Sequence, residues 1–236
     1  MTDSDAGPDS EFDATADADS AVDAHADHAH AVAEPSDDGG WPVTLDGVTE
    51  SVVTTHGPND RWNVAALGLH APAGGVSPGE TTPVEAVTWG NTRTRRNFHR
   101  REEGVVQFVS DPRDFVDAAL TIREEATPIL DSADAWVRVS VDPIDEGTEG
   151  DTDWERWRLT PGSGGVRRTR PFTINRAFYA VVDATVAASR LDVPAYDTDT
   201  LLDRLAYFST VVERCGGTAE REAFARLDRE TGWRDR

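Results

Sequence analysis

The chain has 236 residues and a formal net charge of −21, and all 23 of its basic residues are arginine. So negative a protein is poorly suited to binding the nucleic-acid backbone, and its single cysteine excludes a disulfide within the chain. No apolar run reaches 18 residues and no signal peptide is recognisable, so we expect a soluble, cytoplasmic protein without a membrane segment. An acid-rich, lysine-free composition suits very salty cytoplasm, where ions screen the repulsion, and it predicts a halophilic source.

Residues 1–40 hold twelve of the 44 acidic residues, no arginine and almost no large apolar side chain. Such a segment cannot bury enough surface to offset the entropy of ordering it, which predicts a disordered acidic tail. Three histidines alternate with acidic residues there: His25, His28 and His30. Two interpretations of these histidines stay open, a metal site and a low-complexity tail.

From Trp41 onward, short β-branched or aromatic runs alternate with turn residues, which is the pattern of strands. The turn sequence HGPND, residues 56–60, predicts a hairpin between the first two strands. Six short strands with few helices between them indicate an antiparallel barrel or sandwich. The predicted strands cover residues 50–55, 62–69, 84–90, 105–110, 135–144 and 153–160.

One helix is predicted directly after the fourth strand. Asp111 is a good N-cap, and Pro112 suits the first helical position. The spacing of Phe115, Ala118 and Ala119 predicts that these side chains face inward.

The sequence PGSGG, residues 161–165, predicts a flexible break before a helical C-terminal part. Helical periodicity and capping residues then predict a small subdomain of three helices, over 174–191, 197–217 and 218–233. The first of these helices is expected to present one face made of Ile174, Phe178, Val181, Val182, Thr185 and Ser189. Cys215, near the end of the second, is predicted to be a packing residue rather than a nucleophile.

An arginine cluster lies in the sequence TWGNTRTRRNFHRREEG, residues 88–104. Five arginines fall within nine positions: Arg93, Arg95, Arg96, Arg100 and Arg101. The pattern predicts a helix capped by Thr94 and ended by Gly104, with arginines at its positive end and glutamates at its negative end. That arrangement destabilises a helix unless an anion binds at its N-terminus. Three interpretations stay open: a site for a ligand phosphate, a solvated helix face, and a nucleic-acid surface.

Several segments together resemble an archaeal family, the domain of unknown function 447: ESVVTT, NVAALGL, TRTRRNF, VVQFVSDPRDFVDAAL and NRAFYAVVDATVAASRL. This family is similar to the FMN-binding split β-barrel superfamily, which includes flavin reductases. The resemblance implies an α+β fold, an antiparallel split β-barrel with a small C-terminal helical subdomain. The expected parts are the acidic tail over 1–40, an FMN-binding domain over 41–165 and the helical subdomain over 166–236.

The resemblance also implies FMN as cofactor, a homodimer, and two sets of FMN contacts. The isoalloxazine ring and ribityl chain would lie along Thr54, Thr55, Asn63 and Ala65. The phosphate would be held by Thr92, Thr94, Arg96 and Asn97. The chain departs from the family pattern at Ala66, where proline is usual, and at Phe108, where asparagine is usual.

Three functions stay open on these grounds. The first is a flavin-dependent oxidoreductase whose small-molecule redox partner is unknown, and the second is a non-catalytic flavin or nucleotide sensor or carrier. The third is an interaction protein that docks through its acidic tail and helices. No side chain stands out as an acid or base. His56, His70 and His99 are the candidates, but they are expected to lie at the surface or behind the residues that contact a ligand.

Overall fold

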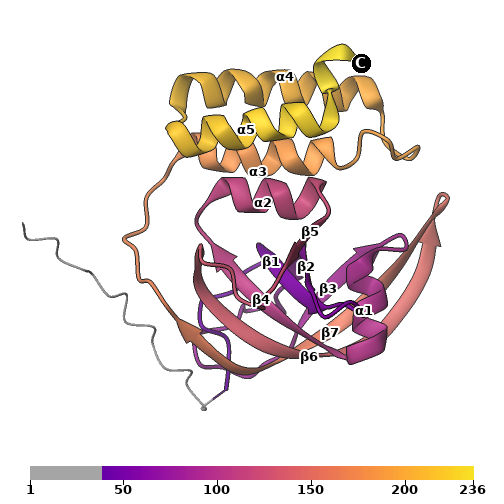
Figure 1. The fold of residues 1–236 in the computed structure, drawn as a ribbon, viewed down its shortest axis with the longest axis vertical. Coiled ribbons are helices and arrows are strands. Elements are labelled where there is room, and N and C mark those ends of the chain that lie inside the picture. The colour runs from indigo at the N-terminus through magenta and orange to yellow at the C-terminus, as the bar shows by residue number, and fades with distance from the viewer. Residues whose placement is uncertain (1–38) are drawn as a thin grey trace, which may run out of the picture. The chain divides into compact units, whose positions relative to one another are not determined.

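The computed structural model describes residues 39–236, and its central feature is a closed β-barrel (Figure 1). Six antiparallel strands form the ring in the order β1-β4-β6-β7-β3-β2, and β2 pairs with β1 to close it. The strands are β1 (Val48–His56), β2 (Trp62–His70), β3 (Val84–Trp89), β4 (Glu103–Val109), β6 (Ala133–Glu149) and β7 (Thr152–Val166). The predicted α+β fold, an antiparallel split barrel with C-terminal helices, is confirmed.

The barrel encloses an apolar core because its strands alternate buried and more exposed side chains. On β7, for example, Glu155, Trp157 and Leu159 are buried and the residues between them are not. The helix α1 (Arg93–Arg101) adds Phe98, whose ring packs edge-on against Trp157 with centroids 5.2 Å apart. Phe98 therefore fixes α1 to the barrel core.

The strands β6 and β7 form a longer hairpin than the sequence indicated, with the turn at Gly150. The segment 161–165, expected to be a flexible break, is the end of β7, so that expectation is wrong. A Cβ atom on Gly164 would lie 2.7 Å from the Trp136 carbonyl oxygen. This glycine therefore serves the close approach of two strands. The three-residue strand β5 (Arg123–Glu125), which pairs with the start of β2, was not predicted.

The part of the chain that the structure describes has five helices: α1, α2 (Pro112–Leu120), α3 (Arg176–Ala188), α4 (Thr198–Cys215) and α5 (Thr218–Thr231). The 3-10 turn η1 (Trp233–Asp235) follows them. The three predicted C-terminal helices are thus confirmed. Ile174 and Ser189 lie just outside α3 and are exposed, so the predicted helical face does not extend to either of them. Cys215 is also exposed, at the last residue of α4, which contradicts its predicted packing role.

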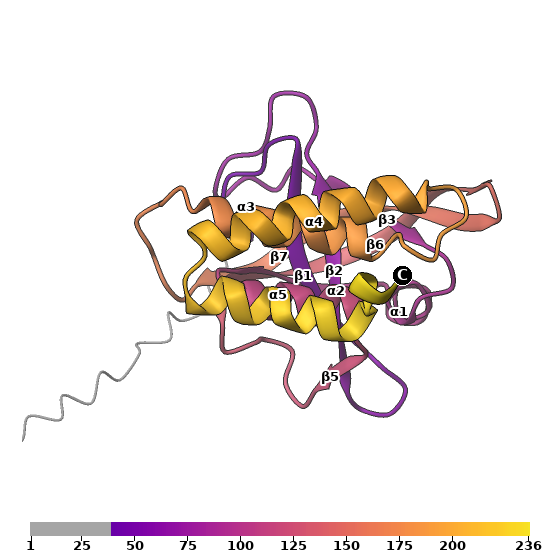
Figure 2. The same cartoon turned by 90° about the horizontal axis from the view of Figure 1, so that it is seen from above.

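Helix α2 begins as predicted, with the Asp111 side chain accepting a hydrogen bond from the Arg113 backbone N–H. It packs against the barrel on one side and against the C-terminal helices on the other (Figures 1 and 2). Phe115 and Ala118 join an apolar cluster with residues of β1 and β2, as their predicted inward orientation required. Val116 joins the apolar core of α3, α4 and α5 instead. Ala119, predicted to face inward, is half-buried.

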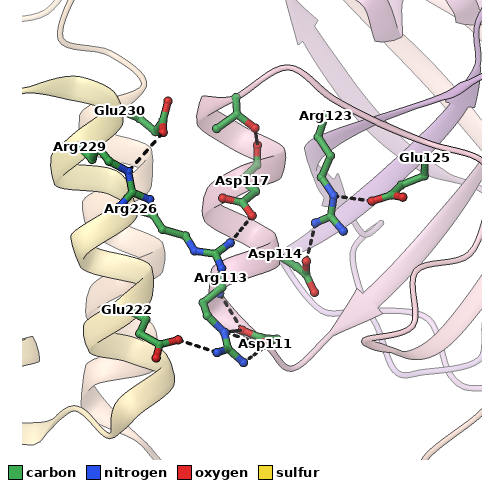
Figure 3. Close-up of polar contacts among 11 residues, drawn as sticks. Asp111, Arg113, Asp114, Asp117, Arg123, Glu125, Glu222, Arg226, Arg229 and Glu230 are labelled. Carbon is green, nitrogen blue, oxygen red and sulfur yellow. Dashed lines mark hydrogen bonds and ion pairs between the residues drawn. The ribbon is translucent and has the colours of Figure 1, made fainter.

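Charged side chains reinforce the contacts of α2 (Figure 3). Arg113 forms a 2.6 Å ion pair with Glu222 of α5, and Arg226 of α5 pairs with Asp117. On the barrel side, Asp114 pairs with Arg123 of β5. These pairs are partly exposed and each is worth little alone, but they tie α2 to α5 and to β5 at once.

The Asp111 cap predicts a pH dependence of stability. The hydrogen bond from Arg113 lowers the pKa of the Asp111 carboxyl below its usual 3.8. Because the folded pKa is the lower one, the carboxylate stabilises the fold above its unfolded pKa and loses this effect as pH falls through the folded value. Asp111→Asn, which can still cap the helix, should therefore lose less unfolding free energy than the wild type between about pH 5 and pH 2. Denaturant unfolding measures this, and equal losses in both proteins would contradict it.

The expectations for the tail, including its disorder and the metal site at His25, His28 and His30, lie outside the described residues. Within residues 39–236, no group of metal-ligating side chains is present and no helix is long and apolar enough to cross a membrane. The division of the chain into domains at residue 165 stays a prediction.

Candidate functional site

Helix α1 carries the arginine cluster, but its ends differ from the prediction. Its N-cap is Thr92, whose hydroxyl accepts a hydrogen bond from Arg95 N at 3.2 Å. Thr94, the predicted cap, is buried and accepts a 3.3 Å hydrogen bond from the Asn63 side chain instead. The helix ends at Arg101, and the next residue, Glu102, is its C-cap and adopts the left-handed conformation with φ 54°. Gly104 lies in β4, where its Cβ position faces Phe98 at 3.3 Å, so it serves close packing and not capping.

One face of α1 is fixed to the barrel by a buried carboxylate. Arg95 and His99, one turn apart, both contact Glu155 Oε2, at 2.7 and 2.8 Å. The Glu155 side chain is only 3% exposed. His99 also packs edge-on against Trp157, with centroids 5.0 Å apart. These two side chains are therefore structural, since both contact a carboxylate inside the protein.

A second face of α1 carries Arg93, Arg96 and Arg100, which follow the helical spacing i, i+3, i+7. Arg93 Nη1 lies 2.5 Å from Glu124 Oε1. Arg96 and Arg100 donate instead to neutral oxygens, those of Asn91 (2.8 and 3.0 Å) and Asn97 (2.8 Å). The cluster thus divides into a structural face and a face that keeps a surplus of positive charge.

Two adjoining clefts lie beside α1. The first, which we call the β2 cleft, has a volume of about 500 Å³, within the range of small-molecule sites. Its walls come from β2, the end of β3, the start of α1, the end of α2 and Ser189 after α3. No Asp or Glu is among the described residues that line it, although the chain is strongly acidic. The lining residues are 63–67, 87–89, 91–94, Arg96, Ala118, Ala119, Thr121, Ile122 and Ser189.

The strand β2 offers this cleft an open edge. One side of β2 pairs with β1 along its whole length. The other side pairs with β5 at residues 62–64 and with β3 at Leu69 and His70. Among the described residues, the stretch 65–68 has no strand partner on that side. Its outward backbone groups can therefore bond a ligand.

The second cleft, which we call the arginine cleft, has a volume of about 300 Å³ and adjoins the first. The two clefts share Asn63, Arg93 and Arg96. The remaining lining residues of the arginine cleft are Gly57, Pro58, Asn59, Asn97, Arg100 and Glu124. Three arginines and three asparagines therefore surround it, which is a donor set suited to an anion.

The structure brings together most of the residues predicted to contact FMN. Those in the wall of the β2 cleft are Asn63, Ala65, Thr92, Thr94 and Arg96, and Asn97 lies in the arginine cleft. Thr54 and Thr55 are fully buried in β1 and lie outside both clefts. The Thr54 hydroxyl donates to the Pro128 carbonyl at 2.6 Å, and the Thr55 hydroxyl accepts from the Asn97 side chain at 3.0 Å. Contact of these two threonines with a ligand stays a prediction.

Several lining residues were not predicted. Arg93 and Arg100 share the helical face of Arg96, and their spacing alone could have shown this. The β2 cleft is also lined by Thr121 and Ile122, just after α2, and by Ser189, just after α3. No local sequence pattern reports such a long-range arrangement. The histidines considered as acids or bases lie outside both clefts, and His70 and His99 are exposed.

Comparisons with known proteins agree with this architecture. The DUF447 N-terminal domain model, described as a protein of unknown function, matches residues 49–168, and the DUF447 C-terminal model matches residues 175–229. An FMN-bound DUF447 protein from Methanosarcina mazei is 20% identical, with a TM-score of 0.63 over 78% of this chain and 95% of that one.

Two further structures are more distant. The styrene monooxygenase flavin reductase of Pseudomonas putida S12 is 12% identical, with a TM-score of 0.34, and covers 52% of this chain and 81% of its own. An FMN-binding protein from Thermus thermophilus is also 12% identical, with a TM-score of 0.34 over 61% and 76% of the two chains. A comparison with curated protein sequences found no relative. Since the N-terminal family model alone spans more than half of the sequence, the chain belongs to the DUF447 family.

Proposed function

We propose that this protein binds FMN, with the flavin ring in the β2 cleft and the phosphate beside Arg96. The observation that carries the proposal is the β2 cleft itself. It combines an open strand edge, a lining without acidic residues and the N-terminus of α1 in one space. A family member from Methanosarcina mazei that shares the fold has FMN bound.

The residues present fit the chemical groups of FMN. Small apolar side chains, among them Ala65, Ala66 and Ala118, leave room for a flat ring against β2. The open edge of β2 can bond the polar edge of that ring. At the other end, Arg96, the Thr92 hydroxyl and the positive N-terminal end of α1 suit a phosphate.

We further propose a flavin-dependent oxidoreductase whose substrate is unknown. When bound, FMN supplies hydride acceptance and donation. The chain's own residues would bind and orient it, and Trp89 and Ile122, which are 47% and 76% exposed, would shield one side of the cleft from water. Among the described residues lining the β2 cleft, none except arginine is ionisable, so the protein supplies no acid or base there. Hydride transfer needs none, and neither does the second candidate, a non-catalytic flavin sensor or carrier.

The visible absorption spectrum of the protein, purified in high salt, tests the proposal. We expect flavin bands from bound FMN, or from added FMN that stays with the protein through gel filtration. Anaerobic bleaching of these bands by NADH would identify an oxidoreductase, and a stable spectrum would favour the sensor or carrier. A protein that neither contains nor retains FMN would refute both.

As part of the same proposal, the protein is a homodimer in the cytoplasm of a halophilic archaeon. The exposed side chains of Trp89 and Ile122 are suited to burial by a second copy next to the cleft. Light scattering in molar salt should therefore give twice the chain mass of 25.7 kDa. A flavin-bound monomer would refute the dimer.

A further inference from the structure

Glu124 is the one acidic residue among the described residues that line either cleft. It lies on β5, paired with Asn63 of β2, so its side chain reaches the arginine cleft from the barrel edge. Its backbone is held as well, because Arg61 donates to the Glu124 carbonyl at 3.1 Å. A carboxylate placed by the fold inside an arginine-lined cleft requires an explanation.

The Glu124 carboxylate lies among donors that also suit a phosphate. Arg93 Nη1 approaches its Oε1 at 2.5 Å, and Asn59 Nδ2 donates to its Oε2 at 3.2 Å. Guanidinium and amide N–H groups bind carboxylate and phosphate oxygens in similar ways. The Glu124 side chain is 29% exposed, so it can move out into water. Its position therefore marks where an anion fits.

Charge favours an external anion over this internal one. Three arginines face a single carboxylate in the arginine cleft, which leaves two positive charges uncompensated. Among the described residues, the Arg96 and Arg100 side chains donate only to asparagine oxygens. Arg95, on the structural face of α1, has a buried carboxylate partner. The surplus matches the charge of a phosphate monoester near neutral pH.

We propose that the arginine cleft is a phosphate-binding site and that Glu124 acts there as an internal competitor. A ligand phosphate that enters displaces the Glu124 carboxylate from Arg93 and Asn59. The phosphate comes either from FMN or from a second phosphorylated ligand bound beside it. Only the identification of the phosphate as that of FMN rests on the proposed function, because the site itself requires no flavin.

Calorimetric titration of the full chain with inorganic phosphate, at an ionic strength kept constant with NaCl, tests the site. Glu124→Gln keeps the size of the side chain but removes the competing charge. It should bind phosphate about threefold to tenfold more tightly than the wild type. Arg100→Ala should bind it at least about tenfold more weakly, because a charge-assisted hydrogen bond is lost.

Matched controls lie outside both clefts. Glu103→Gln and Arg101→Ala make the same changes of charge and should leave phosphate affinity unchanged. Thermal unfolding verifies that each variant folds, and Arg100→Lys replaces Arg100→Ala if that variant does not. Phosphate binding that Glu124→Gln weakens or leaves unchanged would overturn the proposal. So would the absence of measurable phosphate binding.

Titration of FMN-loaded protein with inorganic phosphate shows which ligand brings the phosphate to the cleft. If FMN and inorganic phosphate exclude each other and Arg100→Ala weakens FMN, the cleft holds the phosphate of FMN. If phosphate still binds the loaded protein and depends on Arg100, the cleft serves a second phosphorylated ligand. Either result supports the site. A protein that binds phosphate but no flavin would refute the proposed function and leave this inference standing.

Discussion

Replacing Arg96 with Ala should weaken FMN binding about tenfold to a hundredfold, because charge-assisted hydrogen bonds to a phosphate contribute about 1.5–3 kcal/mol. Arg96 lines both clefts and lies in the first turn of α1, where the helix dipole also favours an anion. Within the described residues, its side-chain hydrogen bonds come only from Nη1, to Asn91. The rest of its guanidinium fork can therefore contact a ligand. Titration of the apo-protein, followed by flavin fluorescence, measures the loss.

Riboflavin, which lacks the phosphate, is the matched ligand for this experiment. It should bind wild type and Arg96→Ala about equally. Arg101→Ala is the matched protein, because Arg101 lies on the same helix outside both clefts, 3.4 Å from a His56 nitrogen. If Arg96→Ala weakens FMN and riboflavin alike, or neither of them, the phosphate assignment is wrong.

Replacing Glu155 with Gln should lower the free energy of unfolding by about 1.5–3 kcal/mol, since a buried carboxylate that accepts bonds from Arg95 and His99 loses its charge. Gln keeps the volume of the side chain, so packing around Trp157 is preserved. The variant should also bind FMN more weakly, because these contacts hold α1 against the barrel. Denaturant unfolding in high salt measures the stability, and the flavin titration measures the affinity.

Glu85→Gln is the control for Glu155→Gln. Glu85 lies on β3 and pairs with Arg156 at 3.8 Å, but both side chains are about half exposed. Its replacement should change stability by no more than about 0.5 kcal/mol. Equal effects of the two substitutions would show that burial of Glu155 contributes nothing.

The barrel could be predicted from the sequence because each strand carries a local signal, such as the alternation around Trp157 or the turn between β1 and β2. Local signals failed where another part of the chain decided the outcome. Gly164 looked like part of a flexible break, but it allows β7 to approach β6. Thr94 looked like a helix cap, but Asn63 of β2 binds it within the protein.

For the candidate site too, local sequence patterns predicted part of the arrangement and missed what distant residues decide. The spacing of Arg93, Arg96 and Arg100 places them on one helical face, and this information lies within eight residues. Their separation from Arg95 and His99 depends on Glu155, which lies more than fifty residues further along the chain. Likewise, β5 is too short to be recognised, so the acidic residue facing the arginines could not be foreseen.

Helix α2 has a consequence for how the two matched segments of the family can vary. By position in the chain it belongs to the N-terminal segment, and its last residues form part of the β2 cleft. By packing it also belongs to the C-terminal segment, which covers Val116 and pairs with Arg113 and Asp117. The two segments therefore cannot diverge independently at this helix, and exchanging either one with a distant relative would disturb the wall of the cleft. Compatible pairs of segments would have to be inherited together.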